Sequence, residues 1–294
     1  MNTLFASCQR NGPKALLWFS IFWLALLALS CRSTPAPKTS DMPKRIALVS
    51  DTHTNPGTNV DRARYQGYLE QVIAEVNDAK VDVVLMAGDL TEDGSPEELA
   101  SFREQIKRFR APVLFVPGNH DVGNKLIPGK GGTVTAKRVA NYEMKMGPSF
   151  FVRQLAGVRV IGINSPIFGS GFPQEQAMWK LLEKELAKPS PQPTVVFSHY
   201  PAFVKTPGEG GGDYWNIEPE PRRRLLALLQ QGGVRAMLTG HLHRELINRH
   251  EGILYATTPP VSFGLPAGKQ AEGWTLVTLP AQGEAQAEFR HIRH

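Results

Sequence analysis

Cysteine is nearly absent from this sequence. Among its 294 residues there are only two, Cys8 and Cys31, and both lie within the first 31 positions. The rest of the chain therefore has no disulfide framework and no thiolate chemistry. Any polar site beyond residue 31 must use oxygen and nitrogen groups.

Acidic residues are absent from the first 40 positions, which contain four basic ones. Most of the formal net charge of +6 lies in this segment, because the remaining chain has 29 basic and 27 acidic residues. A nearly neutral body lacks the basic excess that binding to a phosphate backbone requires. We therefore expect no nucleic-acid partner.

Long apolar runs are also absent, apart from one near the N-terminus. Residues 15–30 are all apolar or small, and Arg10 and Lys14 precede them. Sixteen residues rise about 24 Å as a helix, less than the roughly 30 Å of a bilayer's hydrocarbon core. The pattern therefore favours a signal peptide. Cys31 resembles the lipidated cysteine of bacterial lipoproteins, although Ala28 stands where such proteins usually have leucine.

These features predict three parts of the chain. Residues 1–30 form a signal peptide or membrane anchor, the Pro-rich residues 31–43 a tether, and residues 44–294 the folded domain. We expect an exported bacterial lipoprotein, in the periplasm or at the cell surface, held at the membrane by lipidated Cys31. A secreted protein and an uncleaved single-span anchor are the alternatives.

From residue 44 onward, short apolar runs alternate with helical patterns. Helical spacing covers 65–76, 95–109, 173–188 and 221–231, and Ser95, Pro96 and Glu98 match an N-cap with a capping box. This alternation predicts an α/β fold, and 41% hydrophobic residues suffice for its core. The eight runs predicted as buried strands are 46–50, 83–86, 113–116, 158–163, 195–198, 236–239, 253–256 and 274–279.

Asp, Asn or His follows five of these runs within three positions. Ligands of open α/β sheets bind beyond the carboxyl ends of the strands, so we expect these side chains to converge. The five segments are Asp51-Thr52-His53, Gly88-Asp89, Gly118-Asn119-His120-Asp121, Ser198-His199 and Gly240-His241-Leu242-His243.

The residue types indicate a pair of metal ions. Two Asp, one Asn and four His offer seven nitrogen and oxygen ligands, a set that suits Mn, Fe or Zn and is too large for one ion. Two ions that share one carboxylate would use all seven. Such a pair suits in-line displacement at phosphorus.

The ordered motifs D-x-H, GD, GNHD, H and GHxH resemble the calcineurin-like metallophosphoesterase superfamily over residues 44–280. The resemblance implies an α/β/β/α sandwich of four layers with two mixed sheets. It also implies that Asp89 bridges two ions. The implied ligands are Asp51, His53, Asp89 and His243 for one ion, and Asp89, Asn119, His199 and His241 for the other.

The same resemblance implies a mechanism. A hydroxide that bridges the ions attacks phosphorus, and His120 contacts the phosphate and protonates the leaving oxygen. Asp121 is expected to orient His120, with a simple turn cap as the alternative. Two glycine-rich stretches, 123–133 and 207–215, are candidates for substrate contact or solvated connectors. The basic run 222–224 is expected on a solvated helix face.

The branch of the superfamily remains open. Glu92 stands where purple acid phosphatases have a metal-bound tyrosine, and the GDxxDRG arginine of Ser/Thr phosphatases is absent. Residues 88–98 resemble class III cyclic-nucleotide phosphodiesterases and glycerophosphodiesterases, whereas 117–124 and 213–226 resemble calcineurin-like phosphoesterase-domain Ser/Thr phosphatases. The substrate is therefore a small phosphate ester or a phosphoprotein. A non-catalytic metal-binding module and a nuclease are the weaker alternatives.

Overall fold

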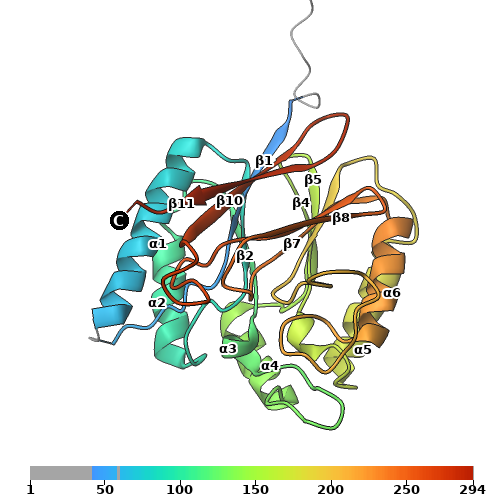
Figure 1. Ribbon diagram of the computed structural model, residues 1–294, viewed down its shortest axis with the longest axis horizontal. Coiled ribbons are helices and arrows are strands. Elements are labelled where there is room, and N and C mark those ends of the chain that lie inside the picture. The colour runs from blue at the N-terminus through green and yellow to red at the C-terminus, as the bar shows by residue number, and fades with distance from the viewer. Residues whose placement is uncertain (1–41, 58–59, 294) are drawn as a thin grey trace, which may run out of the picture. The chain divides into compact units, whose positions relative to one another are not determined.

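The structure is a computed structural model that describes residues 42–57 and 60–293. Two mixed sheets form its centre (Figure 1). In the first sheet, with order β11-β10-β1-β2-β3, the strands are β1 (Lys44–Val49), β2 (Val83–Ala87), β3 (Val113–Val116), β10 (Gly273–Leu279) and β11 (Gln286–His291). In the second sheet, with order β4-β5-β6-β7-β9-β8, they are β4 (Phe151–Leu155), β5 (Val158–Gly162), β6 (Thr194–Phe197), β7 (Val234–Thr239), β8 (Leu246–His250) and β9 (Ile253–Thr257).

Helices cover the outer faces of the two sheets, which gives four layers. Figure 1 shows α1 (Val60–Ala79) and α2 (Pro96–Ile106) beside the first sheet, and α5 (Pro173–Glu185) and α6 (Pro219–Gln231) beside the second. The short α3 (Asn119–Val122) and α4 (Ala136–Met146) lie at one end of the sheets. The predicted α/β/β/α sandwich is therefore confirmed.

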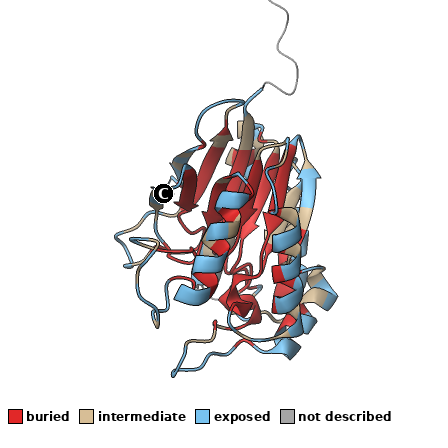
Figure 2. Ribbon diagram, turned by 90° about the vertical axis from the view of Figure 1, so that its right-hand side faces the viewer, coloured by how far each residue is buried: buried red, intermediate tan, exposed pale blue. Residues whose placement is uncertain are grey.

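Alternating side chains separate the inner core from the outer ones. In β1, Ile46 and Leu48 point into the cluster between the sheets, whereas Ala47 and Val49 belong to the cluster shared with the helices. All four are fully buried, and burial of each large one contributes roughly 1.5–3 kcal/mol. The strands are correspondingly buried throughout most of their length (Figure 2). Rigid strands hold the residues that follow them in fixed positions.

All eight predicted strands are present, but three others were not predicted. These are β4, β8 and β11, each at a sheet edge and each paired antiparallel with one neighbour. Half-exposed edge strands mix polar and apolar residues, so they lack the continuous apolar run of an inner parallel strand.

The helices differ from the predictions in several places. The Ser95 cap and the capping box with Glu98 are confirmed, but α6 begins at Pro219 rather than at residue 221, and α4 was not predicted. The prediction of a solvated basic run is wrong for Arg222, which is 1% exposed. Its guanidinium is held by the Glu209 backbone carbonyl and the Ile217 carbonyl.

The predicted leader and most of the predicted tether lie outside the described residues. Within the part of the chain that the structure describes, no helix combines the length and apolar character needed to cross a bilayer. The division into leader, tether and domain stays a prediction.

Candidate metal centre

The carboxyl ends of five parallel strands meet at one edge of the sandwich. β1, β2 and β3 of the first sheet deliver the segments around Asp51, Asp89 and Asn119, and β6 and β7 of the second deliver His199 and His241. Backbone hydrogen bonds join neighbouring segments: the Asp51 N–H donates to Gly88 O (3.0 Å), and the His53 N–H to Asp89 O (3.1 Å). The two sheets together therefore build one site.

The backbone is strained where these side chains are presented. Eight non-glycine residues in the described chain have positive φ, and five of them are predicted ligands. Left-handed backbone is uncommon outside glycine and is often found at functional sites, with Asp and His enriched among the exceptions. In two of the segments, residues two positions apart, Asp51 with His53 and His241 with His243, thereby both reach the centre. The five residues are Asp51, His53, Asp89, His241 and His243.

Two motif glycines permit the close approach of strand ends. A Cβ on Gly118 would lie 2.1 Å from Oδ1 of Asp89, and one on Gly240 would lie 1.8 Å from Oγ of Ser50. No side chain fits in either place. The glycines of GNH and GH are therefore needed to bring neighbouring ligand segments together.

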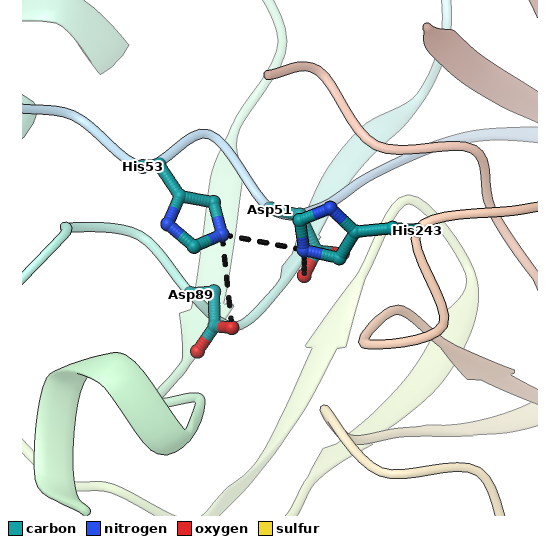
Figure 3. Close-up of side chains that lie close together, drawn as sticks. All are labelled: Asp51, His53, Asp89 and His243. Carbon is teal, nitrogen blue, oxygen red and sulfur yellow. Dashed lines mark hydrogen bonds and ion pairs between the residues drawn. The ribbon is translucent and has the colours of Figure 1, made fainter. Parts of the chain in front are cut away.

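The first ligand cluster contains Asp51, His53, Asp89 and His243, all buried. Nε2 of His53 lies 3.3 Å from Nε2 of His243 and 3.9 Å from Oδ2 of Asp89. Nε2 of His243 lies 3.2 Å from Oδ1 of Asp51. Figure 3 shows the two imidazoles turned toward one another, with the two carboxylates beside them.

The second ligand cluster contains Asp89, His199 and His241, with Asn119 beside them. Nε2 of His199 is 3.1 Å from Oδ2 of Asp89, 3.0 Å from Oδ1 of Asn119 and 3.1 Å from Nδ1 of His241. Asp89 belongs to both clusters. The structure thus brings all seven predicted ligands together, in the two predicted groups.

The hydrogen bonds of the imidazoles fit metal binding. In each of the four rings, the nitrogen that faces away from the centre is paired with a carbonyl or carboxylate oxygen, so the inner nitrogen is the one that can bind a cation in place of a proton. Oδ1 of Asp51 is buried and accepts no hydrogen bond within the described residues. The inward-facing imidazole nitrogens and the buried carboxylates of Asp51 and Asp89 form a donor set that fits cations. The outer pairs are His53–Glu92 (2.9 Å), His199–Ala87 O (2.8 Å), His241–Tyr214 O (3.2 Å) and His243–Phe263 O (2.6 Å).

The pKa values of Asp51 and Asp89 are both lowered, as expected for carboxylates that face positive charge. Burial raises the pKa of Asp51, but the nearby His243 outweighs burial and lowers this pKa to about 2. Asp89 is shifted in the same direction, because His199 and His53 oppose the effect of burial on its pKa. Both carboxylates are therefore ionised at neutral pH, as metal ligands must be.

The pKa values of the imidazoles diverge. Burial lowers the pKa of His199, but Asp89 more than compensates and raises this pKa to about 9. Burial and the neighbouring His199 lower the pKa of His241 to about 3. Cations at the centre would replace the proton that Asp89 otherwise stabilises on His199.

His120 lies beside the first cluster without belonging to either ligand group. Its ring is 4.5 Å from that of His53, and its Nδ1 donates to the Glu92 carbonyl (2.6 Å). Burial lowers the pKa of His120, but Asp89 and this hydrogen bond outweigh burial and raise it above its ordinary value. A partly exposed, protonatable imidazole at this position can donate a proton to a bound molecule.

Within the described residues Asp121 has no hydrogen bond to the His120 ring, so its expected role in orienting His120 stays a prediction. The Asp121 carboxylate accepts from the N–H groups of Gly118 (2.7 Å), Leu90 (3.2 Å) and Thr91 (3.0 Å). It therefore ties the β2 and β3 loops together, the turn-cap alternative. Burial and the nearby Asp89 raise its pKa to about 6.

Two residues near the centre were not predicted as site residues. The Glu92 carboxylate holds His53, and the Glu92 carbonyl holds His120. Tyr214 lies on the second glycine-rich stretch, where its hydroxyl is 3.0 Å from Nδ2 of Asn119. Glu92 follows Asp89 by three positions, the place where purple acid phosphatases have a tyrosine ligand. Its position could therefore have indicated a residue close to the metal centre. No sequence pattern singled out Tyr214 from its loop.

This chain is similar in sequence to proteins named as a phosphatase and as a probable phosphodiesterase. It is 29% identical to the serine/threonine-protein phosphatase CPPED1 of Danio rerio over 230 residues, 71% of this chain and 69% of the relative. It is also 29% identical to a protein of Arcobacter nitrofigilis named "Probable glycerophosphodiester phosphodiesterase GpdQ" over 256 residues, 83% and 84% of the two chains.

A solved structure agrees with the fold. A dimetal phosphatase from Danio rerio superposes with a TM-score of 0.53 at 13% identity, covering 83% of this chain and 98% of that one. The calcineurin-like phosphoesterase family model matches residues 44–245, a range that includes every member of both ligand clusters. With a match of this extent, the chain belongs to the calcineurin-like phosphoesterase family and is a metal-dependent phosphoric ester hydrolase.

Proposed function

We propose that the two ligand clusters hold two cations and that the centre hydrolyses small phosphate esters. The observation that carries this proposal is the sharing of Asp89 by two groups of inward-facing imidazole nitrogens. Nitrogen and oxygen donors without sulfur suit Mn, Fe or Zn. Bound cations would supply Lewis acidity, which neutralises charge on the phosphoryl oxygens and lowers the pKa of a water molecule.

The chain's own residues supply positioning and proton transfer. The imidazoles are held in one orientation by their outer hydrogen bonds, so little reorganisation is needed when the ester binds. His120 acts as the general acid toward the leaving oxygen, with Nδ1 occupied by the Glu92 carbonyl and Nε2 available to the substrate. General acid catalysis of this kind contributes about 10²–10⁴-fold.

The test is a Mn²⁺-supplemented assay of an aryl phosphomonoester against the matching bis-aryl diester, with metal content measured on the same sample. We expect turnover of at least one ester and two ions per chain. An Asn119→Ala variant should lose activity sharply. Turnover that survives in this variant, or that needs no metal, would contradict the proposal. Fewer than two ions per chain with no turnover would favour a non-catalytic binding module.

A phosphodiester substrate is the second candidate. The relative named as a glycerophosphodiester phosphodiesterase matches more of this chain than the phosphatase relative does, 83% against 71%. Preference for the bis-aryl ester would support this candidate, and cyclic AMP would then be tested as a substrate. Preference for the monoester, or for a phosphopeptide, would favour a phosphatase.

We also propose that the N-terminal leader exports the domain and holds it at a membrane through Cys31. β1 begins at Lys44 and the centre follows its far end at Asp51, so a tether that precedes Lys44 joins the domain about 20 Å from the centre. Labelling of cells with a radioactive fatty acid should mark the protein but not its Cys31→Ala variant. A protein that is unlabelled and found in the medium would instead be secreted.

A further inference from the structure

Tyr214 lies at the rim of the second ligand cluster. Its hydroxyl oxygen is 3.0 Å from Nδ2 of Asn119, and its carbonyl oxygen is 3.2 Å from Nε2 of His241. Its ring is 4.7 Å from the ring of His241. The residue is nevertheless 38% exposed, which is unusual for a large apolar side chain in this molecule. Tyr214 therefore borders both the centre and the solvent.

The hydrogen bond to Asn119 leaves the phenolic hydrogen free. Oδ1 of Asn119 faces Nε2 of His199 at 3.0 Å, so the amide presents Nδ2, a donor, to Tyr214. The phenolic oxygen must accept this bond. Within the described chain the hydroxyl has no other hydrogen bond. Its own hydrogen can therefore be donated to an anion that binds at the centre.

Buried ion pairs hold the Tyr214 loop in place. Lys125, 3% exposed, donates to the Glu218 carboxylate (2.7 Å) and to the Asn216 carbonyl. The Glu209 carboxylate accepts from the N–H groups of Val204 (2.7 Å) and two following residues, and it pairs with Arg222 (3.7 Å). A loop fixed on both sides of Tyr214 presents its hydroxyl without a large entropic cost on binding.

We propose that Tyr214 is a substrate-binding residue, which donates its phenolic hydrogen to an oxygen of the phosphoryl group beside Asn119. This inference rests on the proposed function and adds a third kind of contact to the cations and to His120. His120 stands by His53 of the first cluster, whereas Tyr214 stands by the second. The two donors therefore reach the substrate from different clusters.

The test compares the full-length protein with Tyr214→Phe, which keeps the ring and removes the hydroxyl. Calorimetric titration of the Mn²⁺-loaded proteins with inorganic phosphate should give a dissociation constant about 10- to 100-fold weaker in the variant, the usual loss for a hydrogen bond to a charged group. kcat/KM for the aryl phosphomonoester or its diester should fall by a similar factor. Tyr255→Phe is the matched control, because that ring packs against Phe203 and not against a ligand.

Each outcome decides the matter. Weaker phosphate binding with two Mn²⁺ still bound supports the proposal, whereas unchanged phosphate binding overturns it. Loss of one Mn²⁺ with full recovery of phosphate affinity in excess metal would show that Tyr214 acts only through Asn119, which also overturns it. A wild-type protein that binds phosphate and hydrolyses neither ester would contradict the proposed function alone, because the binding comparison still tests Tyr214.

Discussion

The two ligand clusters are supported in different ways. In the first, His53 is held by the carboxylate of Glu92, whose side chain is 35% exposed. In the second, both histidines are held by backbone carbonyls, those of Ala87 and Tyr214. The carbonyl of Tyr214 in turn depends on a loop that is fixed by buried ion pairs.

In the first cluster a side chain that can be substituted holds a ligand, whereas in the second cluster the backbone holds both histidines. The Glu92 carboxylate fixes the orientation of the His53 ring, and a single substitution can remove this support. Backbone carbonyls cannot be substituted, so the support behind the two histidines of the second cluster responds only to changes that move a loop or a strand. We therefore expect point substitutions to affect the two clusters separately, except at Asp89.

The largest effect is expected from Asp89→Ala, because this residue belongs to both clusters. The variant should bind neither ion firmly and should lose measurable turnover. Asp51→Ala, which removes a member of the first cluster only, should retain one ion. Metal content per chain, measured by mass spectrometry, checks both expectations. Asp89→Asn preserves side-chain volume and guards against misfolding; two ions in this variant would disprove the shared role.

His120→Asn should reduce kcat/KM by about 10²–10⁴-fold for an alkyl phosphate ester, since the leaving alkoxide then departs without a proton. The loss should be much smaller for a p-nitrophenyl ester, whose leaving group needs little protonation. Metal content should stay at two ions. His250→Asn, on the edge strand β8, serves as the control. Equal losses for both esters would mean that His120 is not the general acid.

Glu92→Gln should weaken the binding of an ion at the first cluster by about 10- to 100-fold and leave the affinity of the second cluster unchanged. The carboxylate behind His53 is lost, while the outer carbonyls of the second cluster remain. Stepwise Mn²⁺ titration followed by calorimetry would resolve the two affinities. Glu97→Gln, on the exposed face of α2, should change neither. A parallel loss at both ions would contradict independent support of the clusters.

Lys125→Met should have the smallest effect on the ions, and only on the second cluster, because Lys125 acts through the Tyr214 loop. It leaves the Glu218 carboxylate buried without its partner, so the free energy of unfolding should fall by about 3 kcal/mol. Lys130→Met is the control, since that exposed lysine bonds the same loop at Gly212 O. Chemical denaturation of both variants measures the difference; equal stability would show that the buried pair does not support the loop.

Much of the fold could be predicted because its inner strands are parallel and buried on both faces. β2 contains no exposed residue, so its run of apolar residues at 83–86 is enough to predict it as a buried strand. β11 has the burial pattern of a surface strand, and its pairing with β10 supplies what its sequence does not specify. An edge strand forms because it pairs with a neighbouring strand, and the local sequence does not show which strand that is.

The ligand clusters were predictable for a related reason. Strand ends that are rich in Asp and His must meet if the strands are parallel. The division of these residues into two groups came from the resemblance of the ordered motifs to a known family. The hydrogen-bond acceptors that hold the outer nitrogens of the histidines were harder to predict from the sequence. The hydrogen bond of His241 to Tyr214 spans 27 positions, and that of His243 to Phe263 spans 20. The hydrogen bonds of the Asp121 carboxylate to Leu90 and Thr91 cross about 30 positions of the chain, and no local pattern predicted them.

The sequence by itself determined which residues could serve as ligands, because residue type and position after an apolar run are local properties. Tertiary structure alone decided which nitrogen of each histidine faces the centre, which loop covers the second cluster, and that Arg222 and Lys125 are buried. These features depend on contacts between segments distant in the chain, and the free energy of such contacts comes from packing and desolvation rather than from any local pattern.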